Sequence, residues 1–200
     1  SRSALTGGGA VRGAADKIIE KGTKIAAHIM EAASTDIEFE NGVFRVAGTD
    51  KKVGIQEVAK TAFNPTALPN DVEAGFYEQS TYTPSTSSFP NGCHVCEVEV
   101  DKETGKVEIV KYVAVDDVGK VVNSLTLEGQ IHGGIVQGAG QALMENIVYD
   151  PDNGQMLSGS FMDYCMPRAD DFCIFDIKNN PVPAKTNILG IKGAGEAGTT

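Results

Sequence analysis

The sequence predicts an α+β fold in which long helices pack on an antiparallel or mixed sheet. Three observations support this class. Apolar residues recur at helical spacing in two long segments, one near the N-terminus and one around residue 135. Runs of alternating polar and apolar residues, the pattern of half-buried strands, lie between these segments. Short turn sequences join several of the runs, which favours antiparallel neighbours.

The expected elements follow one another along the chain. An amphipathic helix extends from about Val11 to about Ala33, because apolar residues recur there every three or four positions. Two alternating segments around Asn41-Gly42 predict a β-hairpin, since this dipeptide favours the tight turns of hairpins. The other predicted elements are the hairpin strands Ile37–Glu40 and Val43–Val46, a short helix Ile55–Phe63, an antiparallel meander of Phe76–Tyr82, Cys93–Asp101 and Lys106–Asp116, a glycine-rich helix Glu128–Glu145, and strands Ser158–Met162 and Cys173–Ile177.

The glycine-rich helix is the most unusual of these elements. Each glycine inside a helix is less favourable than alanine by roughly 0.5–1 kcal/mol, so the missing side chains are expected to permit a close contact. Ile131 and Ile135 belong to an apolar stripe that we expect to be buried. Gln137 lies away from that stripe and is expected to be more open.

A second stripe on this helix is formed by Gln130, Gly134, Gln137 and Gln141, which fall within about 40° of one line. Glutamine amides offer hydrogen-bond donors and acceptors, and glycines let a planar ligand approach the backbone. The stripe therefore predicts a surface for a planar polar ligand such as a pterin or a nucleobase. Close packing of helices through small residues is the alternative explanation.

The bulk composition excludes several classes of partner. A formal net charge of −10 argues against nucleic acid and anionic membranes, because both need a basic surface. No apolar run approaches the roughly 18 residues of a membrane span, and residues 1–13 lack the apolar core of a signal peptide, so a cytoplasmic protein is expected. Four cysteines without regular spacing favour reduced thiols over a disulfide framework.

No metal site is predicted from protein side chains. Cys93-His94-Val95-Cys96 contains metal-binding residue types, but it falls in a predicted strand, where the two sulfurs point to opposite faces. His28 and His132 have no second ligand at helical spacing and are interpreted as core or surface residues.

Two segments near the chain ends are candidate functional sites. Gly193-x-Gly195-x-x-Gly198 fits the glycines of a dinucleotide fingerprint, but no helix and acidic residue follow it. Glu196 in this segment is either a surface residue or a general base that the glycines allow ligands to approach. The segment Ser1-Arg2-Ser3 precedes a helix, where backbone N–H groups and the guanidinium could bind an anion; a flexible terminus is the alternative.

Two motifs together resemble the large, molybdopterin-binding subunits of the molybdenum hydroxylases: EGQIHGGIVQGAGQAL in the glycine-rich helix and KGAGEAGT at 192–199. This family includes xanthine oxidase, aldehyde oxidase and aerobic carbon monoxide dehydrogenase. The segments FPNGCHVCEVEVD, YVAVDDVGKVVN and SFMDYCMPRADD extend the resemblance over nearly all 200 residues. The similarity is greatest to the bacterial carbon-monoxide-dehydrogenase-like branch.

The resemblance implies an oxidoreductase with a molybdopterin cofactor, often in its cytosine dinucleotide form, that oxidises a small carbon substrate (CO, an aldehyde or an N-heterocycle) with water as the oxygen source. It also implies iron–sulfur and flavin subunits or domains as electron-accepting partners. Glu196 matches the catalytic base of the family. The positions implied to contact the cofactor are Ser1, Arg2, Ser3, Gln137, Lys192 and Gly193, together with Asp117, Asn123 and Gln130, which are assigned by neighbourhood.

By the same resemblance, residues 1–200 are the C-terminal part of the molybdopterin-binding region, truncated at both ends, because the subunits of the family are several times longer. The upstream half, with the copper-holding cysteine loop of carbon monoxide dehydrogenases, is not part of this sequence, so nothing in it specifies CO. We expect this chain alone to fold, to bind no molybdenum cofactor and to be inactive without the remainder of the large subunit. A non-catalytic binding or assembly module is the alternative, and the retained Glu196 favours the enzyme.

Overall fold

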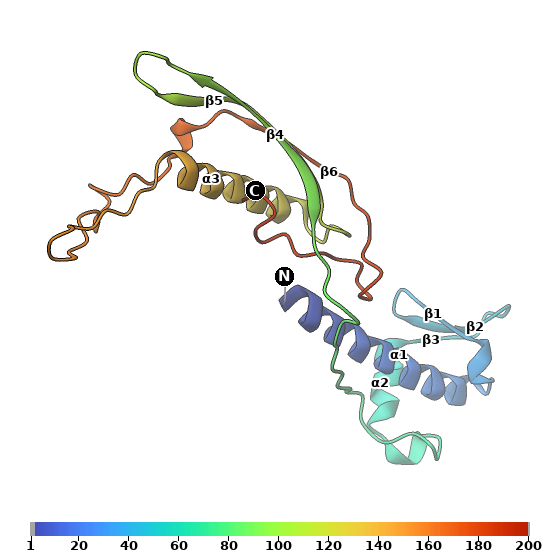
Figure 1. The fold of residues 1–200 in the computed structure, drawn as a ribbon. Helices are drawn as coiled ribbons and strands as arrows, with labels where there is room; N and C mark the ends of the chain where they lie inside the picture. The colour runs from blue at the N-terminus through green and yellow to red at the C-terminus, as the bar shows by residue number, and fades with distance from the viewer. Residues whose placement is uncertain (1–2, 200) are drawn as a thin grey trace. The chain divides into compact units, whose positions relative to one another are not determined.

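The computed structural model describes residues 3–199, so that Ser1, Arg2 and Thr200 lie outside the described residues. The chain divides into two compact units, which are considered one at a time. The smaller unit is Thr6–Thr83, and the larger unit combines Ser1–Leu5 with Pro84–Thr200. The ribbon in Figure 1 follows the order of the elements from blue to red.

The smaller unit packs helices against a three-stranded antiparallel sheet. Its elements are α1 (Gly8–Met30), β1 (Ile37–Glu40), β2 (Val43–Val46), β3 (Lys52–Gly54) and α2 (Ile55–Ala62), with strand order β1-β2-β3. Phe44 is fully buried in the core, and Gly22 of α1 makes room for it, because a Cβ there would lie 2.6 Å from the phenyl ring. Both predicted helices and the hairpin are confirmed, whereas β3 was not predicted.

The strand predicted at Phe76–Tyr82 is wrong, because this segment forms no strand ladder. It follows α1 instead and is held there by side chains. The ring of Tyr82 occupies the space above Gly9, where a Cβ would come within 2.2 Å of it, and Lys17 Nζ donates a hydrogen bond to the Gln79 carbonyl at 2.8 Å. An alternating sequence therefore packs on a helix here without joining a sheet.

The larger unit contains a long antiparallel hairpin with a third strand added in parallel. Strands β4 (Asn91–Val100) and β5 (Val107–Asp117) pair antiparallel, and β6 (Phe175–Asn179) pairs parallel with β5, which gives the order β4-β5-β6. The mixed sheet confirms the predicted α+β class.

Short helical turns occur in both units. They are η1 (Ser3–Gly7), η2 (Ser34–Asp36), η3 (Pro65–Ala67) and η4 (Ala169–Asp171), of which η1 is a π-helical turn leading into α1.

The second strand prediction that fails is Ser158–Met162. This segment belongs to the long connection between α3 and β6, which Figure 1 shows in orange. Two parts of this connection are joined by the hydroxyl of Ser158, which accepts a hydrogen bond from the backbone N–H of Val148 at 2.9 Å. The predicted strand Cys173–Ile177 is confirmed in a shifted form as β6.

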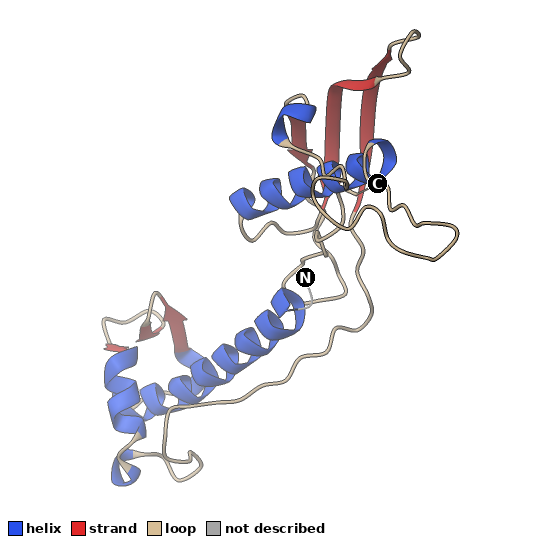
Figure 2. Ribbon diagram, turned by 90° about the vertical axis from the view of Figure 1, so that its left-hand side faces the viewer, coloured by secondary structure: helices blue, strands red, loops and turns tan. Residues whose placement is uncertain are grey.

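Helix α3 (Ser124–Leu143) packs across one face of the β4-β5-β6 sheet, as Figure 2 shows. Ile131 and Ile135 are 1 % and 2 % exposed and contact a cluster that includes Tyr112 and Ala114 of β5. The predicted burial of Ile131 and Ile135 is therefore confirmed. The helix begins four residues earlier than predicted because Asn123 caps it, with Oδ1 accepting from the Thr126 N–H at 3.0 Å.

Candidate functional site

The segment 192–199, called the Glu196 loop from here on, lies directly against the backbone of α3. A Cβ on Gly198 would come within 2.4 Å of the Ile131 carbonyl oxygen, and a Cβ on Gly134 would come within 2.9 Å of the Gly198 Cα. Neither position can carry a side chain unless the backbone moves. Two glycines, 64 positions apart in sequence, therefore form the contact that seats the loop on the helix.

Polar contacts fix the loop on either side of Glu196. The amide of Gln130 on α3 donates a hydrogen bond to the Gly195 carbonyl at 2.8 Å. On the other side, the N–H of Thr199 donates to the Glu196 carbonyl at 3.1 Å. The backbone of the residue that carries the carboxylate is thus held, while the side chain of Glu196 remains exposed.

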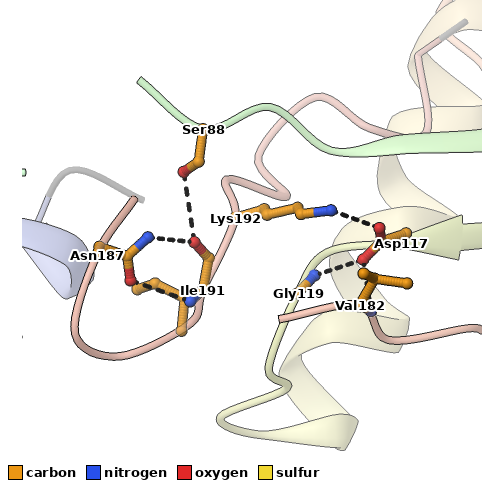
Figure 3. Close-up of polar contacts among 7 residues, drawn as sticks. All are labelled: Ser88, Asp117, Gly119, Val182, Asn187, Ile191 and Lys192. Carbon is orange, nitrogen blue, oxygen red and sulfur yellow. Dashed lines mark hydrogen bonds and ion pairs between the residues drawn. The ribbon is translucent and has the colours of Figure 1, made fainter. Parts of the chain in front are cut away.

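An ion pair joins the start of the loop to the end of β5 (Figure 3). Lys192 Nζ bonds Asp117 Oδ2, and Asp117 Oδ1 accepts from the N–H groups of Gly119 at 2.9 Å and Val182 at 3.0 Å. The bond from Lys192, supported by those from Val182 and Gly119, outweighs desolvation and lowers the pKa of Asp117 from 3.8 to about 2. Asp117 is therefore a carboxylate at neutral pH. Its ion pair with Lys192, called the clasp from here on, holds the start of the loop against the end of β5.

The residue before the loop is held by a second set of bonds, also visible in Figure 3. The side-chain amide of Asn187 donates to the Ile191 carbonyl at 2.9 Å and accepts from the Ile191 N–H at 3.2 Å. The hydroxyl of Ser88 donates to the same carbonyl at 3.3 Å. Because Ile191 is fixed in this way, the direction in which the chain enters the Glu196 loop is fixed too.

The loop forms one wall of a cavity of about 790 Å³ within the larger unit. The opposite wall is the start of β4 together with the segment that leads into it. The lining residues are Ser88, Phe89, Pro90, Asn91, Gly92, His94, Asp116, Gly193, Gly195, Glu196 and Ala197. A cavity of this size fits a small organic ligand, and Glu196 is one of the residues that line it.

Helix α3 also has an open glycine face, formed by Gly129 and Gly133. A Cβ at either position would have no atom within 4 Å, so the backbone is accessible there. Gln137, one turn further along, is exposed as predicted. The predicted glutamine stripe is wrong at Gly134, however, because that glycine is covered by the Glu196 loop and presents no open surface.

The structure brings part of the predicted site together. Gln130, Lys192 and Asp117 hold the Glu196 loop, and Gly193 lines the cavity beside Glu196. Asn123 caps α3, and Gln137 lies on the helix surface next to the open glycine face. Of the N-terminal candidates, Ser3 lies in the π-helical turn η1, and Ser1 and Arg2 lie outside the described residues.

Within residues 3–199, no three His, Cys, Asp or Glu side chains are arranged to hold a metal ion. Over the same residues, no helix has the length and apolar character required to span a bilayer.

Sequence reasoning missed several residues that build the site. Asp116 and His94 line the cavity, and Val182 and Asn187 support the loop from a proline-rich segment for which the sequence predicted no element and no site residue. The signal for Asp116 was present, since two adjacent acidic residues follow an apolar strand. No signal in the sequence pairs Asn187 with Ile191, because an Asn in a proline-rich connection is typical of a turn.

Comparisons with known proteins agree on one family. The sequence profile described as a molybdopterin cofactor-binding domain matches residues 1–173. The gamma subunit of the 6-hydroxypseudooxynicotine dehydrogenase complex of Paenarthrobacter nicotinovorans is 36% identical over 99% of this chain and 25% of its own length. The carbon monoxide dehydrogenase large chain of Hydrogenophaga pseudoflava is 33% identical over 98% of this chain and 24% of its own length.

The fold is shared with a solved structure of similar identity. Quinoline 2-oxidoreductase from Pseudomonas putida 86 superimposes with a TM-score of 0.89 at 36% identity, over 99% of this chain and 25% of that chain. The chain therefore spans about a quarter of the length of the relatives it matches.

Proposed function

The chain belongs to the molybdopterin cofactor-binding domain family, and from this premise we propose that it supplies the catalytic base and part of the cofactor site in the large subunit of a molybdenum hydroxylase. The observation that carries the proposal is the seating of Glu196. Its backbone is fixed by Gln130, by the Asp117–Lys192 clasp and by the glycine contact with α3, while its carboxylate lines the cavity. Rigid backbone with a free carboxylate is what a general base requires.

The residues present fit a molybdopterin. The open glycine face leaves the α3 backbone accessible to a flat ring, and the exposed amide of Gln137 offers both donors and an acceptor to the polar edge of a pterin. When bound, the cofactor supplies the two-electron oxidation of the substrate. Gln137 and the open glycine face would hold it, and we propose the cytosine dinucleotide form.

The role assigned to this chain in the reaction is to handle one proton. Glu196 takes the proton of the water that provides the oxygen atom, which makes that oxygen a better nucleophile towards an electrophilic carbon. Gly193 and Gly195, which precede the base in the loop, carry no side chain that would block a ligand. The electrons then leave to iron–sulfur and flavin partners. The substrate class comprises CO, aldehydes and N-heterocycles.

A non-catalytic binding or assembly module is the second candidate function. It would need the seating of the loop on α3 but not the carboxylate. The exposure of Glu196 at the cavity favours the enzyme, because a scaffold has no need of an exposed carboxylate at this place.

The proposal is tested in the full-length protein with Glu196→Gln, which preserves shape but removes the proton acceptor. We expect unchanged molybdenum content and a loss of turnover of about 10²–10⁴-fold, the usual contribution of a general base. The matched control is Glu99→Gln on the exposed face of β4, which should keep full activity. Loss of molybdenum together with turnover would make Glu196 structural, and retained turnover would favour the non-catalytic module.

A further inference from the structure

The wall opposite the Glu196 loop contains a second carboxylate, that of Asp116, which the proposed function does not use. Asp116 is the penultimate residue of β5 and is only 2 % exposed, although it lines the cavity. Gly92 of β4 stands directly opposite it in the strand register. A Cβ on Gly92 would come within 2.2 Å of Asp116 Oδ1, so residue 92 must be glycine for the carboxylate to occupy this place.

A histidine fixes the orientation of this carboxylate. His94 lies on the same sheet face, with Nε2 3.1 Å from Asp116 Oδ1 and Nδ1 3.0 Å from the Tyr112 hydroxyl. When Nε2–H donates to Asp116, Nδ1 accepts from the tyrosine O–H, so both ring nitrogens have partners. Ala114, directly opposite His94 in the register, is small enough to leave space for the ring.

The other oxygen of the carboxylate has no such partner. Asp116 Oδ2 is buried and accepts no hydrogen bond from residues 3–199. A buried acceptor without a hydrogen bond lowers the stability of the fold by about 1–3 kcal/mol, and by more when it is charged. A hydrogen-bond donor on a bound ligand would explain why the protein has a carboxylate oxygen at this place. Among residues 3–199, the lining of the cavity contains two acidic residues, Glu196 and Asp116, and no lysine or arginine. A ligand that brings its own N–H groups would complete this site, and a ligand carboxylate would be repelled.

We propose that the Asp116 carboxylate, held by His94 and approached past Gly92, accepts a hydrogen bond from an N–H group of the molecule that occupies the Glu196 cavity. This inference rests on the proposed function for the identity of that cavity as the ligand site. The chemistry is that of an amide, amidine or amino-heterocycle. Two sources could supply the donor, an amino or ring N–H of the cofactor or an N–H of the substrate, and both use the same acceptor.

The test compares benzamide with acetophenone, a probe of similar shape in which a methyl group replaces the amide nitrogen. Binding to the full-length holoenzyme is measured by calorimetry, and molybdenum and pterin per chain are measured on the same preparation. If the substrate supplies the donor, the wild type binds benzamide about tenfold more tightly than acetophenone, the usual effect of one charge-assisted bond. Asp116→Asn keeps the size and the bond to His94 but replaces the acceptor Oδ2 by an NH₂ group, and should abolish the preference.

The Asp116→Asn variant distinguishes the two possible sources of the N–H donor, the substrate and the cofactor. Loss of the benzamide preference with full cofactor content assigns the donor to the substrate, and loss of cofactor assigns it to the cofactor. Unchanged preference together with unchanged cofactor content overturns the proposal. Tyr112→Phe is the matched control, since it removes the other hydrogen bond of His94 but leaves the carboxylate. It should lower the melting temperature only, and if it reproduces the binding changes of Asp116→Asn, the role of Asp116 is structural.

A wild-type measurement keeps the proposal testable if Asp116→Asn does not fold. In a crystal structure of the holoenzyme soaked with benzamide, a cofactor or benzamide nitrogen should lie within about 3.2 Å of an Asp116 oxygen. Absence of any such nitrogen contradicts the proposal. Failure of the proposed base is a separate result, because Glu196→Gln would then retain turnover whatever Asp116 binds.

Discussion

Four of the five glycines of α3 form two sets that face different surroundings, and the fifth, Gly140, packs against Pro167. Gly134 and Gly138 are covered by the Glu196 loop, whose residues Gly198 and Thr199 lie where their side chains would be. Gly129 and Gly133, on the open glycine face of the same helix, have no atom within 4 Å of an added Cβ. The first set is explained by packing inside the chain, whereas the second set has no partner within residues 3–199.

This difference shows what the helix gains from each set. A glycine in a helix is less favourable than alanine by roughly 0.5–1 kcal/mol, and the covered set offsets this because it lets the Glu196 loop pack on the helix. The open set has no such gain in the described chain. A bound ligand is a contact that would require it, so we explain the covered set by the fold and propose a role in cofactor binding for the open set.

The largest effect is expected from Gly198→Ala, which breaks the covered set. The new methyl group would meet the Ile131 carbonyl at 2.4 Å, so the loop must leave the helix or the helix must bend. Overpacking of this kind costs about 1–3 kcal/mol, and we expect a lower melting temperature together with loss of turnover in the full-length enzyme. Gly195→Ala in the same loop is the control, since its Cβ would meet nothing within 4 Å and its stability should be close to that of the wild type.

The next effect concerns the clasp that keeps the covered set closed. The pKa of Asp117 is about 2 in the folded chain, below its ordinary value of 3.8, so the clasp stabilises the fold above pH 4. This stabilisation is lost as the pH falls from about 4 to about 2. Asp117→Asn should lower the unfolding free energy at pH 7 by about 1–3 kcal/mol, because it leaves Lys192 without its carboxylate. The variant should also lose less stability than the wild type as the pH falls from about 4 to about 2, so that this acid limb of its stability curve is flatter.

Thermal melts of wild type and Asp117→Asn across pH 2–7 measure this effect. Parallel acid limbs in the two proteins would show that other carboxylates dominate acid unfolding. Equal melting temperatures at pH 7 would show that the clasp does not hold the loop.

A smaller effect is expected at the start of the helix, close to the open set. Asn123 caps α3 through Thr126, and the loss of such a cap destabilises a helix by about 1 kcal/mol. Asn123→Ala should increase hydrogen exchange in the first turn of α3 and leave the exchange of the covered set unchanged. Faster exchange throughout α3 would show that the two sets are not independent.

Periodic sequence patterns were sufficient to predict α1, the β1–β2 hairpin and the buried face of α3, because these elements depend on residues close in sequence. The segment Phe76–Tyr82 alternates like a strand but packs on α1, and alternation alone cannot identify which surface an extended segment contacts. Strand β6 was located, but its parallel pairing with β5 depends on a long connection whose path no local pattern specifies.

The candidate site was also predictable only where it depends on residues close together in the sequence. Glu196 was identified by its motif, and the exposure of Gln137 followed from helical geometry. The contact between Gly134 and Gly198 was not predictable, because it joins segments far apart in the sequence and leaves no mark except the glycines themselves. Asp116 was overlooked because the resemblance assigned a cofactor contact to its neighbour Asp117 alone, and only the structure shows that the two carboxylates have different partners.

The measurement that tests the difference between the two sets most directly is molybdenum per chain in Gly133→Ala of the full-length protein. The added methyl group meets no atom of the chain, so the cofactor-free protein should be as stable as the wild type or more stable by about 0.5–1 kcal/mol. We predict that the same variant binds the cofactor about tenfold or more weakly, since a methyl group in a tight contact costs about 1–3 kcal/mol. Full molybdenum occupancy at unchanged affinity would contradict the assignment of the open glycine face to the cofactor.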